Sequence, residues 1–134
     1  MGRFLYVVRF QDLEVYRFSR ILARDIYLLS RGFPSDELYG LTSQIRRSSG
    51  SVGAQIAEAW AKRRYVRHFI AKLTDADGGQ LETQHWLQLA VDREYLPIRS
   101  AEPLQETCVT IGRMLGNMIR RAPSFCGVLS SEQQ

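Results

Sequence analysis

Basic side chains gather in one segment of this 134-residue chain, and side chains of this type bind phosphate. Between residues 46 and 72 the only acid is Glu58, and the basic residues are Arg46, Arg47, Lys62, Arg63, Arg64, Arg67 and Lys72. Such a local excess attracts a nucleic-acid backbone, and arginine also binds phosphate bidentately and stacks on bases. Trp60, Tyr65 and His68 are close in sequence and could stack on bases. The alternative is a solvated face, or arginines that pair with acids of another subunit.

A second set of arginines follows the predicted first helix: Arg17, Arg20, Arg24 and Arg31. Their spacings of three, four and seven residues place them on one helical face. They could line a surface that tracks phosphates, or they could pair with Glu14, Asp25 or a neighbouring subunit. We rank them second. The basic residues near the end of the last helix are expected to complement its dipole; they are Arg113, Arg120 and Arg121.

Catalytic and metal-binding patterns are weak. Glu82 and His85 match the Glu-x-x-His spacing of di-iron bundles, but a di-iron site needs a second such pair, and the sequence has none. No nucleophile–histidine pairing or Gly-rich phosphate loop is present. We therefore predict no enzyme activity, no cofactor and no metal, with packing or hydrogen-bonding roles for Glu82 and His85.

Glu58 lies beside the apolar face of the predicted second helix, two residues before Trp60. An isolated buried charge is costly, so a buried Glu58 should be paired. Arg46, Arg47 and Arg67 are the partners that we expect. A structural ion pair is favoured over a general base.

Length and composition are those of one folded domain without disulfides. Cys108 and Cys126 have no metal spacing, which favours a reducing, cytoplasmic setting. Cys108 falls on an apolar helix face and is expected to be a small buried hydrophobe. No apolar stretch is long enough to span a membrane, and the apolar run near the N-terminus is too short for a secretory signal.

The chain reads as four helices, because apolar residues recur at spacings of three and four along most of it. The predicted ranges are residues 12–31, 41–61, 65–92 and 100–121. Asp12 and Ser100 are N-cap types that begin the first and the last. Short connections are typical of an all-α, antiparallel up-down four-helix bundle. Ala122 and Pro123 are predicted to end the fourth helix and to leave a loose tail.

Two segments of small residues weaken the helical pattern. The second predicted helix has 48–54 as its middle, and the third has Gly78 and Gly79. Glycine costs about 1 kcal/mol relative to alanine in a helix interior. We therefore expect another helix backbone to approach closely at 48–54, and a bend or tight crossing at 78–79.

The core is predicted from one apolar face per helix. The faces are Val15, Phe18, Leu22, Ile26 and Leu29; Leu41, Ile45, Val52, Ile56 and Trp60; Val66, Phe69, Ile70, Leu73, Leu81, Leu87 and Val91; and Leu104, Cys108, Ile111, Leu115 and either Met118 or Ile119. Tyr16, Tyr27, Trp86 and Leu89 remain as a surplus, which suggests a second buried surface and hence a homo-oligomer. The alternative is that they are large side chains with exposed edges.

Several motifs occur in a specific order along the chain. They are Phe10–Val15, Phe33-Pro34, Glu37, Gly40–Arg47, Ile56–Glu58, Phe69, Glu82–Leu87 and Tyr95-Leu96. With these motifs the chain resembles, from about Phe10 to Arg121, the small four-helix-bundle proteins encoded within 23S ribosomal RNA intervening sequences. It departs from them at Gly53 and Gln55, where the family often has proline and asparagine, and at Ala59, where glycine is common.

The resemblance implies a pentameric barrel of helical bundles with a role in interaction. A relative in that family is the accessory variability determinant of diversity-generating retroelements, a basic homopentamer that binds nucleic acid and a reverse transcriptase. We predict a non-enzymatic homopentamer that binds RNA or DNA through phosphates as an accessory scaffold, with a reverse transcriptase as partner. The alternative is a structural or protein-interaction oligomer without nucleic-acid binding. Residues 1–9 are an expected N-terminal extension, 10–122 the bundle and 123–134 a flexible tail.

Overall fold

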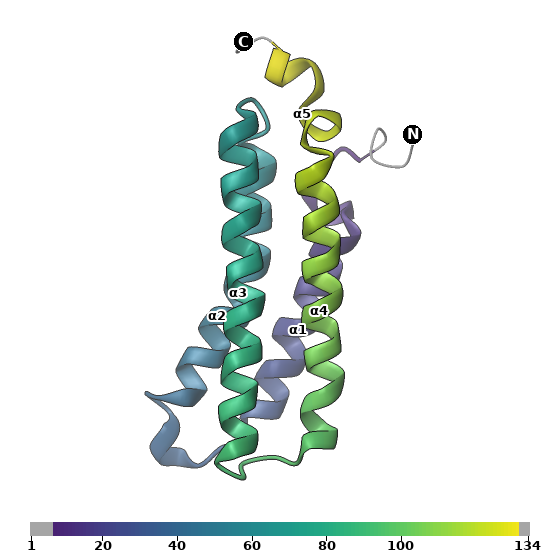
Figure 1. Ribbon diagram of the computed structural model, residues 1–134. Helices are drawn as coiled ribbons and strands as arrows, with labels where there is room; N and C mark the ends of the chain where they lie inside the picture. Colours follow the sequence, from purple (N-terminus) through teal and green to yellow (C-terminus); the bar gives the residue numbers. More distant parts are fainter. Residues whose placement is uncertain (1–6, 132–134) are drawn as a thin grey trace.

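Helices form almost all of the described chain. The computed structural model describes residues 7–131, with side chains as far as residue 127. Its elements are η2 Phe10–Asp12, α1 Glu14–Ser30, η3 Ser35–Glu37, α2 Leu41–Ala61, α3 Val66–Asp92, α4 Ile98–Arg120 and α5 Ala122–Ser131. The first four α-helices alternate in direction and form the predicted up-down bundle, while α5 lies across one end (Figure 1). None of the helices in this part of the chain combines the length and the apolarity that a membrane crossing requires.

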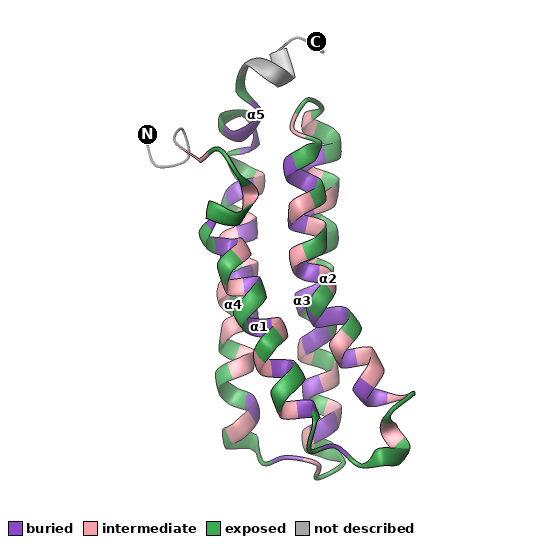
Figure 2. Ribbon diagram, turned by 180° about the vertical axis from the view of Figure 1, so that it is seen from behind, coloured by how far each residue is buried: buried purple, intermediate pink, exposed green. Residues whose placement is uncertain are grey.

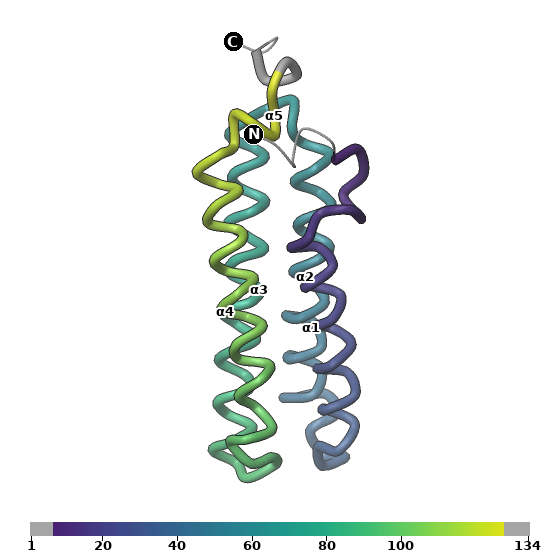
Figure 3. The backbone as a smooth tube through the Cα atoms, turned by 90° about the vertical axis from the view of Figure 1, so that its right-hand side faces the viewer, coloured from purple at the N-terminus to yellow at the C-terminus, as the bar shows by residue number. Residues whose placement is uncertain are grey.

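Each long helix packs on two neighbours. Helices α1 and α3 both contact α2 and α4, so that the four surround one core (Figure 3). The buried residues face inward along all four helices (Figure 2). The largest side chains with almost no exposed surface include Leu22, Ile26, Ile45, Ile56, Phe69, Leu73, Leu87, Ile111 and Leu115, all from the predicted apolar faces. Cys108 is also buried there, as predicted, and burial raises the pKa of its thiol to about 12.

The most extensive helix contact in the bundle is between α2 and α3, where the two small-residue segments meet. A β-carbon added at Gly79 would lie 3.3 Å from the main-chain oxygen of Ser48 and 2.7 Å from Ser51 Oγ. Beside this contact, the hydroxyls of Ser48 and Thr83 are 2.8 Å apart and buried. Helix α3 runs through Gly78 and Gly79 without a break. The short distances at Gly79 confirm the prediction of a tight crossing. We call this contact the α2–α3 seam.

At the end of the bundle away from α5, Glu37 joins two connections. Its carboxylate accepts hydrogen bonds from the Leu41 N–H at 3.0 Å, the Tyr95 hydroxyl at 2.6 Å and Arg93 Nη1 at 3.0 Å. Leu41 is the first residue of α2, so its main-chain N–H has no acceptor within the helix. The Glu37 carboxylate supplies that acceptor. The other two bonds tie the α1–α2 connection to the α3–α4 connection. The Tyr95 hydrogen bond is the largest cause that lowers the pKa of Glu37.

Both predicted N-caps are wrong. Helix α1 begins after Leu13, and the Asp12 carboxylate instead pairs with Arg9 at 3.3 Å. Helix α4 begins at Ile98, because the Pro97 carbonyl accepts the Ser100 N–H at 3.0 Å and closes a turn before the position that we expected. Leu81, assigned to the core from its spacing, is 55% exposed.

The expected loose tail after Pro123 is in fact helical as far as Ser131, apart from a kink at Gly127 with φ of 51°. Phe125 is buried, and its ring lies 6.3 Å from Trp60 and 6.0 Å from Phe69. These aromatic contacts hold the start of α5 on the end of the bundle. Proline is tolerated in the first turn of a helix, so Pro123 follows α4 and also fits into the first turn of α5, which begins at Ala122. Residues 132–134 of the predicted tail and residues 1–6 of the predicted extension lie outside the described residues.

The two adjacent glycines of α3 provide a test of the seam. We expect Gly79→Ala to destabilise the fold by about 1 kcal/mol net, because overpacking by about 1–3 kcal/mol exceeds a gain in helix propensity of about 1 kcal/mol. Gly78 has no neighbour within 4 Å of an added β-carbon. Gly78→Ala should therefore stabilise by about 0.5–1 kcal/mol. Urea unfolding at one protein concentration measures both, and equal effects of the two substitutions would contradict the close approach.

The carboxylate of Glu37 predicts a dependence of stability on pH. Its folded-state pKa lies below the ordinary value of 4.5, so folding favours the ionised form. Its contribution is therefore complete above that value and is lost as the pH falls through the folded-state pKa. Glu37→Gln should lower the urea midpoint at neutral pH and flatten its decline below pH 4.5. Glu102→Gln, at an exposed carboxyl, is the control and should leave the decline unchanged; an unchanged decline in Glu37→Gln as well would contradict the role of Glu37.

Candidate nucleic-acid interface

The α2–α3 turn presents basic side chains at the end of the bundle where α5 also lies. The turn is closed by a hydrogen bond of 3.0 Å from the Tyr65 N–H to the Lys62 carbonyl, and α3 starts directly after it. Because the reversal is tight, Lys62, Arg64 and Arg67 are all exposed within a short length of chain. The structure therefore brings together this part of the predicted phosphate-binding segment.

Arg63 of the same turn is held against the bundle. Its Nε donates to the Trp60 carbonyl at 2.8 Å, and its guanidinium lies 3.8 Å from the centroid of the Trp60 ring. Burial lowers the pKa of Arg63, but a guanidinium stays charged. The Trp60 side chain is buried and donates from Nε1 to the Val8 carbonyl at 3.4 Å. Trp60 is therefore occupied by protein contacts, and the expectation that it could stack on bases is wrong.

Helix α4 ends beside this turn and adds two basic residues. Arg120 and Arg121 are exposed at its last turn, and α5 then leads the chain to Phe125, which contacts Trp60 and Phe69. Both ends of the described chain lie at this end of the bundle (Figure 1). We call this surface the basic end, and it is defined by Lys62, Arg63, Arg64, Arg67, Arg120 and Arg121.

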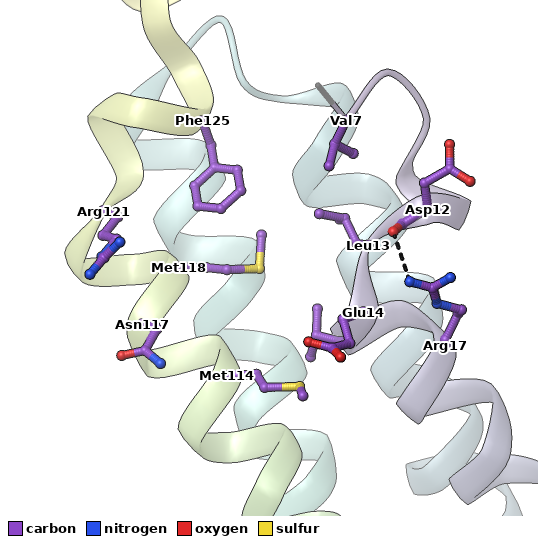
Figure 4. Close-up of a pocket in the computed structure, with 11 residues that line it drawn as sticks. Val7, Asp12, Leu13, Glu14, Arg17, Met114, Asn117, Met118, Arg121 and Phe125 are labelled. Atoms are coloured by element: carbon purple, nitrogen blue, oxygen red, sulfur yellow. Dashed lines mark hydrogen bonds between the residues drawn. The ribbon is translucent and has the colours of Figure 1, made fainter. Parts of the chain in front are cut away.

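A cleft of about 500 Å³ opens between the start of α1 and the end of α4, next to the basic end. Its apolar lining includes Leu13, Met114, Met118 and Phe125, and Figure 4 shows these side chains between Arg17 and Arg121. The guanidinium of Arg17 donates to the Asp12 carbonyl at 3.5 Å. This cleft was not predicted from the sequence, although Met114 and Met118 are four residues apart on one helical face.

Arg46 and Arg47 do not belong to the basic end. Arg47 is fifteen residues before Lys62 on the same helix, which corresponds to about 22 Å along the axis. Arg46 contacts α1, because its Nε donates to Ser30 Oγ at 2.7 Å and its guanidinium lies 4.6 Å from the centroid of the Tyr27 ring. Arg47 is exposed. The predicted single segment is therefore two separate groups.

Lys72, also predicted to bind phosphate, forms an ion pair with Glu58 at 2.9 Å between Nζ and Oε1. Its hydrogen bond is the largest cause that lowers the pKa of Glu58 and that raises the pKa of Lys72. The expected arginine partners of Glu58 are wrong, since the Lys72 amine reaches it from α3. Glu58 is exposed, so the burial on which the expected pairing was conditional does not occur.

The arginines of α1 lie on the outside of the bundle. Arg17, Arg20 and Arg24 are exposed, and Arg24 pairs with Asp25 at 3.2 Å. Asp25 was one of the predicted partners, so this alternative is confirmed for Arg24.

The Glu82 and His85 side chains lie on the surface of α3. Trp86 Nε1 donates to Glu82 Oε2 at 3.2 Å, and the rings of His85 and Trp86 are 4.9 Å apart. Within residues 7–131 no group of three or more His, Cys, Asp or Glu side chains is arranged to hold a metal ion. The hydrogen-bonding role predicted for Glu82 is confirmed.

Comparison with known proteins identifies relatives of the bundle. A family model described as 23S rRNA-intervening sequence protein matches residues 11–117, which span α1, α2, α3 and most of α4. Among solved structures, the chain is similar to a protein of unknown function from the S23 ribosomal protein family of Bacteroides thetaiotaomicron. The two share 29% identity and a TM-score of 0.71, over 78% of this chain and 97% of that chain. Comparison with curated proteins gives no match.

The neighbouring arginines of α2 should respond differently to substitution. Arg46→Ala removes a hydrogen bond and a cation–π contact to α1, and we expect a loss of about 1 kcal/mol in unfolding free energy. Arg47→Ala should change it by less than about 0.5 kcal/mol. Urea unfolding of both variants measures the difference. Equal losses would contradict a structural role specific to Arg46.

Proposed function

The chain belongs to the 23S rRNA-intervening sequence protein family, and we propose that it is a non-enzymatic accessory protein that binds nucleic-acid phosphates at its basic end. The observation that carries this proposal is the uneven distribution of charge along the bundle. At the opposite end, where the α1–α2 and α3–α4 connections lie, the acidic residues are Asp36, Glu37, Asp92, Glu94 and Glu102, with Arg31, Arg93 and Arg99 among them.

This separation concentrates the positive potential of a protein with a net charge of +4 on one surface. Of the acids nearest to the α2–α3 turn, Glu58 pairs with Lys72, and Asp12 pairs with Arg9. Their charges are therefore offset by basic residues outside the turn. A surface of one sign attracts polyanions and speeds their association.

Lys62, Arg64 and Arg67 are the residues that we assign to phosphate contacts. All three are exposed, and long basic side chains can follow a backbone whose geometry varies. Phosphate contacts position a nucleic acid without reading its bases. The proposed binding is therefore largely independent of sequence and accepts RNA or DNA.

The outward face of α1 supports self-association as part of the proposal. Arg17, Ile21, Arg24 and Leu28 recur at helical spacing, and Ile21 and Leu28 are 42% and 52% exposed. Apolar side chains between arginines suit a protein–protein interface. We assign this stripe, with Arg20 beside it, to contacts within a homo-oligomer first and to phosphates second. The family resemblance suggests a pentamer, and a reverse transcriptase as a further partner.

Charge reversal tests the basic end. We expect Lys62→Glu/Arg64→Glu/Arg67→Glu to weaken binding of labelled RNA and duplex DNA at least about tenfold, and to reduce the slope of log K against log salt by about two to three. Arg47→Glu/Arg99→Glu/Arg113→Glu makes the same change in net charge at exposed sites elsewhere, and should retain most of the binding. Fluorescence anisotropy across a salt series measures both variants, and sedimentation checks that each keeps the oligomeric state of the natural protein.

Three outcomes would count against the proposal. Equal weakening in the two triple variants would mean that net charge, and not the basic end, governs binding. Dissociation of the oligomer in the basic-end variant alone would make those residues structural. Failure of the natural protein to bind any nucleic acid at low salt would favour the alternative function, a structural or protein-interaction oligomer built on the α1 stripe.

A further inference from the structure

Two aromatic side chains are exposed at the centre of the basic end. Tyr65 is the residue before α3, and His68 lies in its first turn. The side chain of Tyr65 is 45% exposed, and its ring centroid is 5.3 Å from that of His68, with 43° between the ring planes. Large aromatic residues in a bundle are normally directed into the core, as Phe69 is one residue later. Burial in the core therefore does not account for this pair.

Basic residues precede the pair along the chain and also lie between its two members. Lys62 and Arg64 precede Tyr65, and Arg67 lies between the two rings in sequence; all three are exposed. Trp60 cannot serve the same purpose, because Arg63 covers its ring and Val8 accepts its N–H. The turn thus combines basic side chains with two aromatic side chains that are exposed to solvent.

We propose that Tyr65 and His68 form a stacking platform for unpaired bases, so that the basic end takes single-stranded nucleic acid in preference to duplex. This inference rests on the proposed function and adds a substrate class to it. Bases within a duplex already stack on each other, whereas an unpaired base can place its face on an aromatic ring while its phosphates meet the arginines. Stacking on aromatic side chains contributes about 1–3 kcal/mol per base and tolerates any sequence.

Tyr39 provides a matched control within the same molecule. It is 91% exposed, but it lies in the α1–α2 connection, where Asp36 and Glu37 are its charged neighbours in the chain. Carboxylates disfavour the approach of phosphates, so an exposed ring alone is not sufficient for the proposed site. The position of Tyr65 among basic residues is what distinguishes the two tyrosines.

The test compares Tyr65→Ser/His68→Gln with Tyr39→Ser in the full chain. Serine is a favourable N-cap residue, so the substitution at the start of α3 removes the ring without weakening the helix start. The probes are labelled oligouridylate, oligothymidylate and a duplex of the same length. We expect the double variant to bind one or both single strands about tenfold more weakly and the duplex within about twofold of the natural protein. Tyr39→Ser should match the natural protein throughout, and Tyr65→Phe should retain single-strand binding.

The two oligonucleotides separate RNA from DNA as the source of the unpaired bases, and a loss with either supports the platform. Equal loss for single strand and duplex, or no loss for either single strand, would overturn the platform and leave the phosphate-binding function intact. Failure of the natural protein to bind any of the three probes would instead overturn the proposed function. Thermal unfolding of each variant followed by circular dichroism verifies that a loss of binding does not reflect a loss of fold.

Discussion

The close contact of α2 and α3 at Gly79 is the constraint on which the rest of the structure depends. With Ser48 and Ser51 facing a residue without a side chain, the two backbones can approach until the buried hydroxyls of Ser48 and Thr83 bond. The short connection between the two helices then has to reverse the chain within a few residues. The seam fixes how closely α2 and α3 approach, and the turn that presents Lys62, Arg64 and Arg67 connects these two helices.

The two ends of the bundle use charged residues in different ways. At one end Glu37 accepts hydrogen bonds from three donors, one at the start of α2 and two in the α3–α4 connection, so its charge contributes to joining two connections. At the other end aromatic contacts hold the chain together: Phe125 packs between Trp60 and Phe69, and Arg63 covers Trp60. Because aromatic packing stabilises that end, most of its basic side chains remain exposed to solvent. This division of roles is the physical basis for placing function at the basic end.

Residues that look alike in the sequence differ in their surroundings. Arg46 and Arg47 are neighbours in the chain, yet one contacts Ser30 and Tyr27 across a helix interface and the other is exposed. The apolar faces were predictable to a much larger extent, since Ile45, Ile56 and Leu115 are buried as their spacing requires. Leu81 was assigned to the core from its spacing but is exposed. The apolar stripe of α3 is therefore wider than the surface that the neighbouring helices cover. The segment after Pro123 was misjudged because an aromatic contact from residues far away in the chain orders it.

The sequence alone determined the helices, their inward faces and the membership of a four-helix bundle family. Periodic apolar residues and short connections can be recognised from residues that are close together in the chain. The distribution of the charged groups does not follow in the same way. Some arginines find their partners nearby, as Arg24 does with Asp25 and Arg63 with Trp60. For others the partner is far away in the chain, as with Arg46 and Ser30 or Arg93 and Glu37. Only the folding of α2 against α3 and of α5 onto the bundle end decided which basic residues share a surface, since that surface is assembled from segments that the chain order keeps apart.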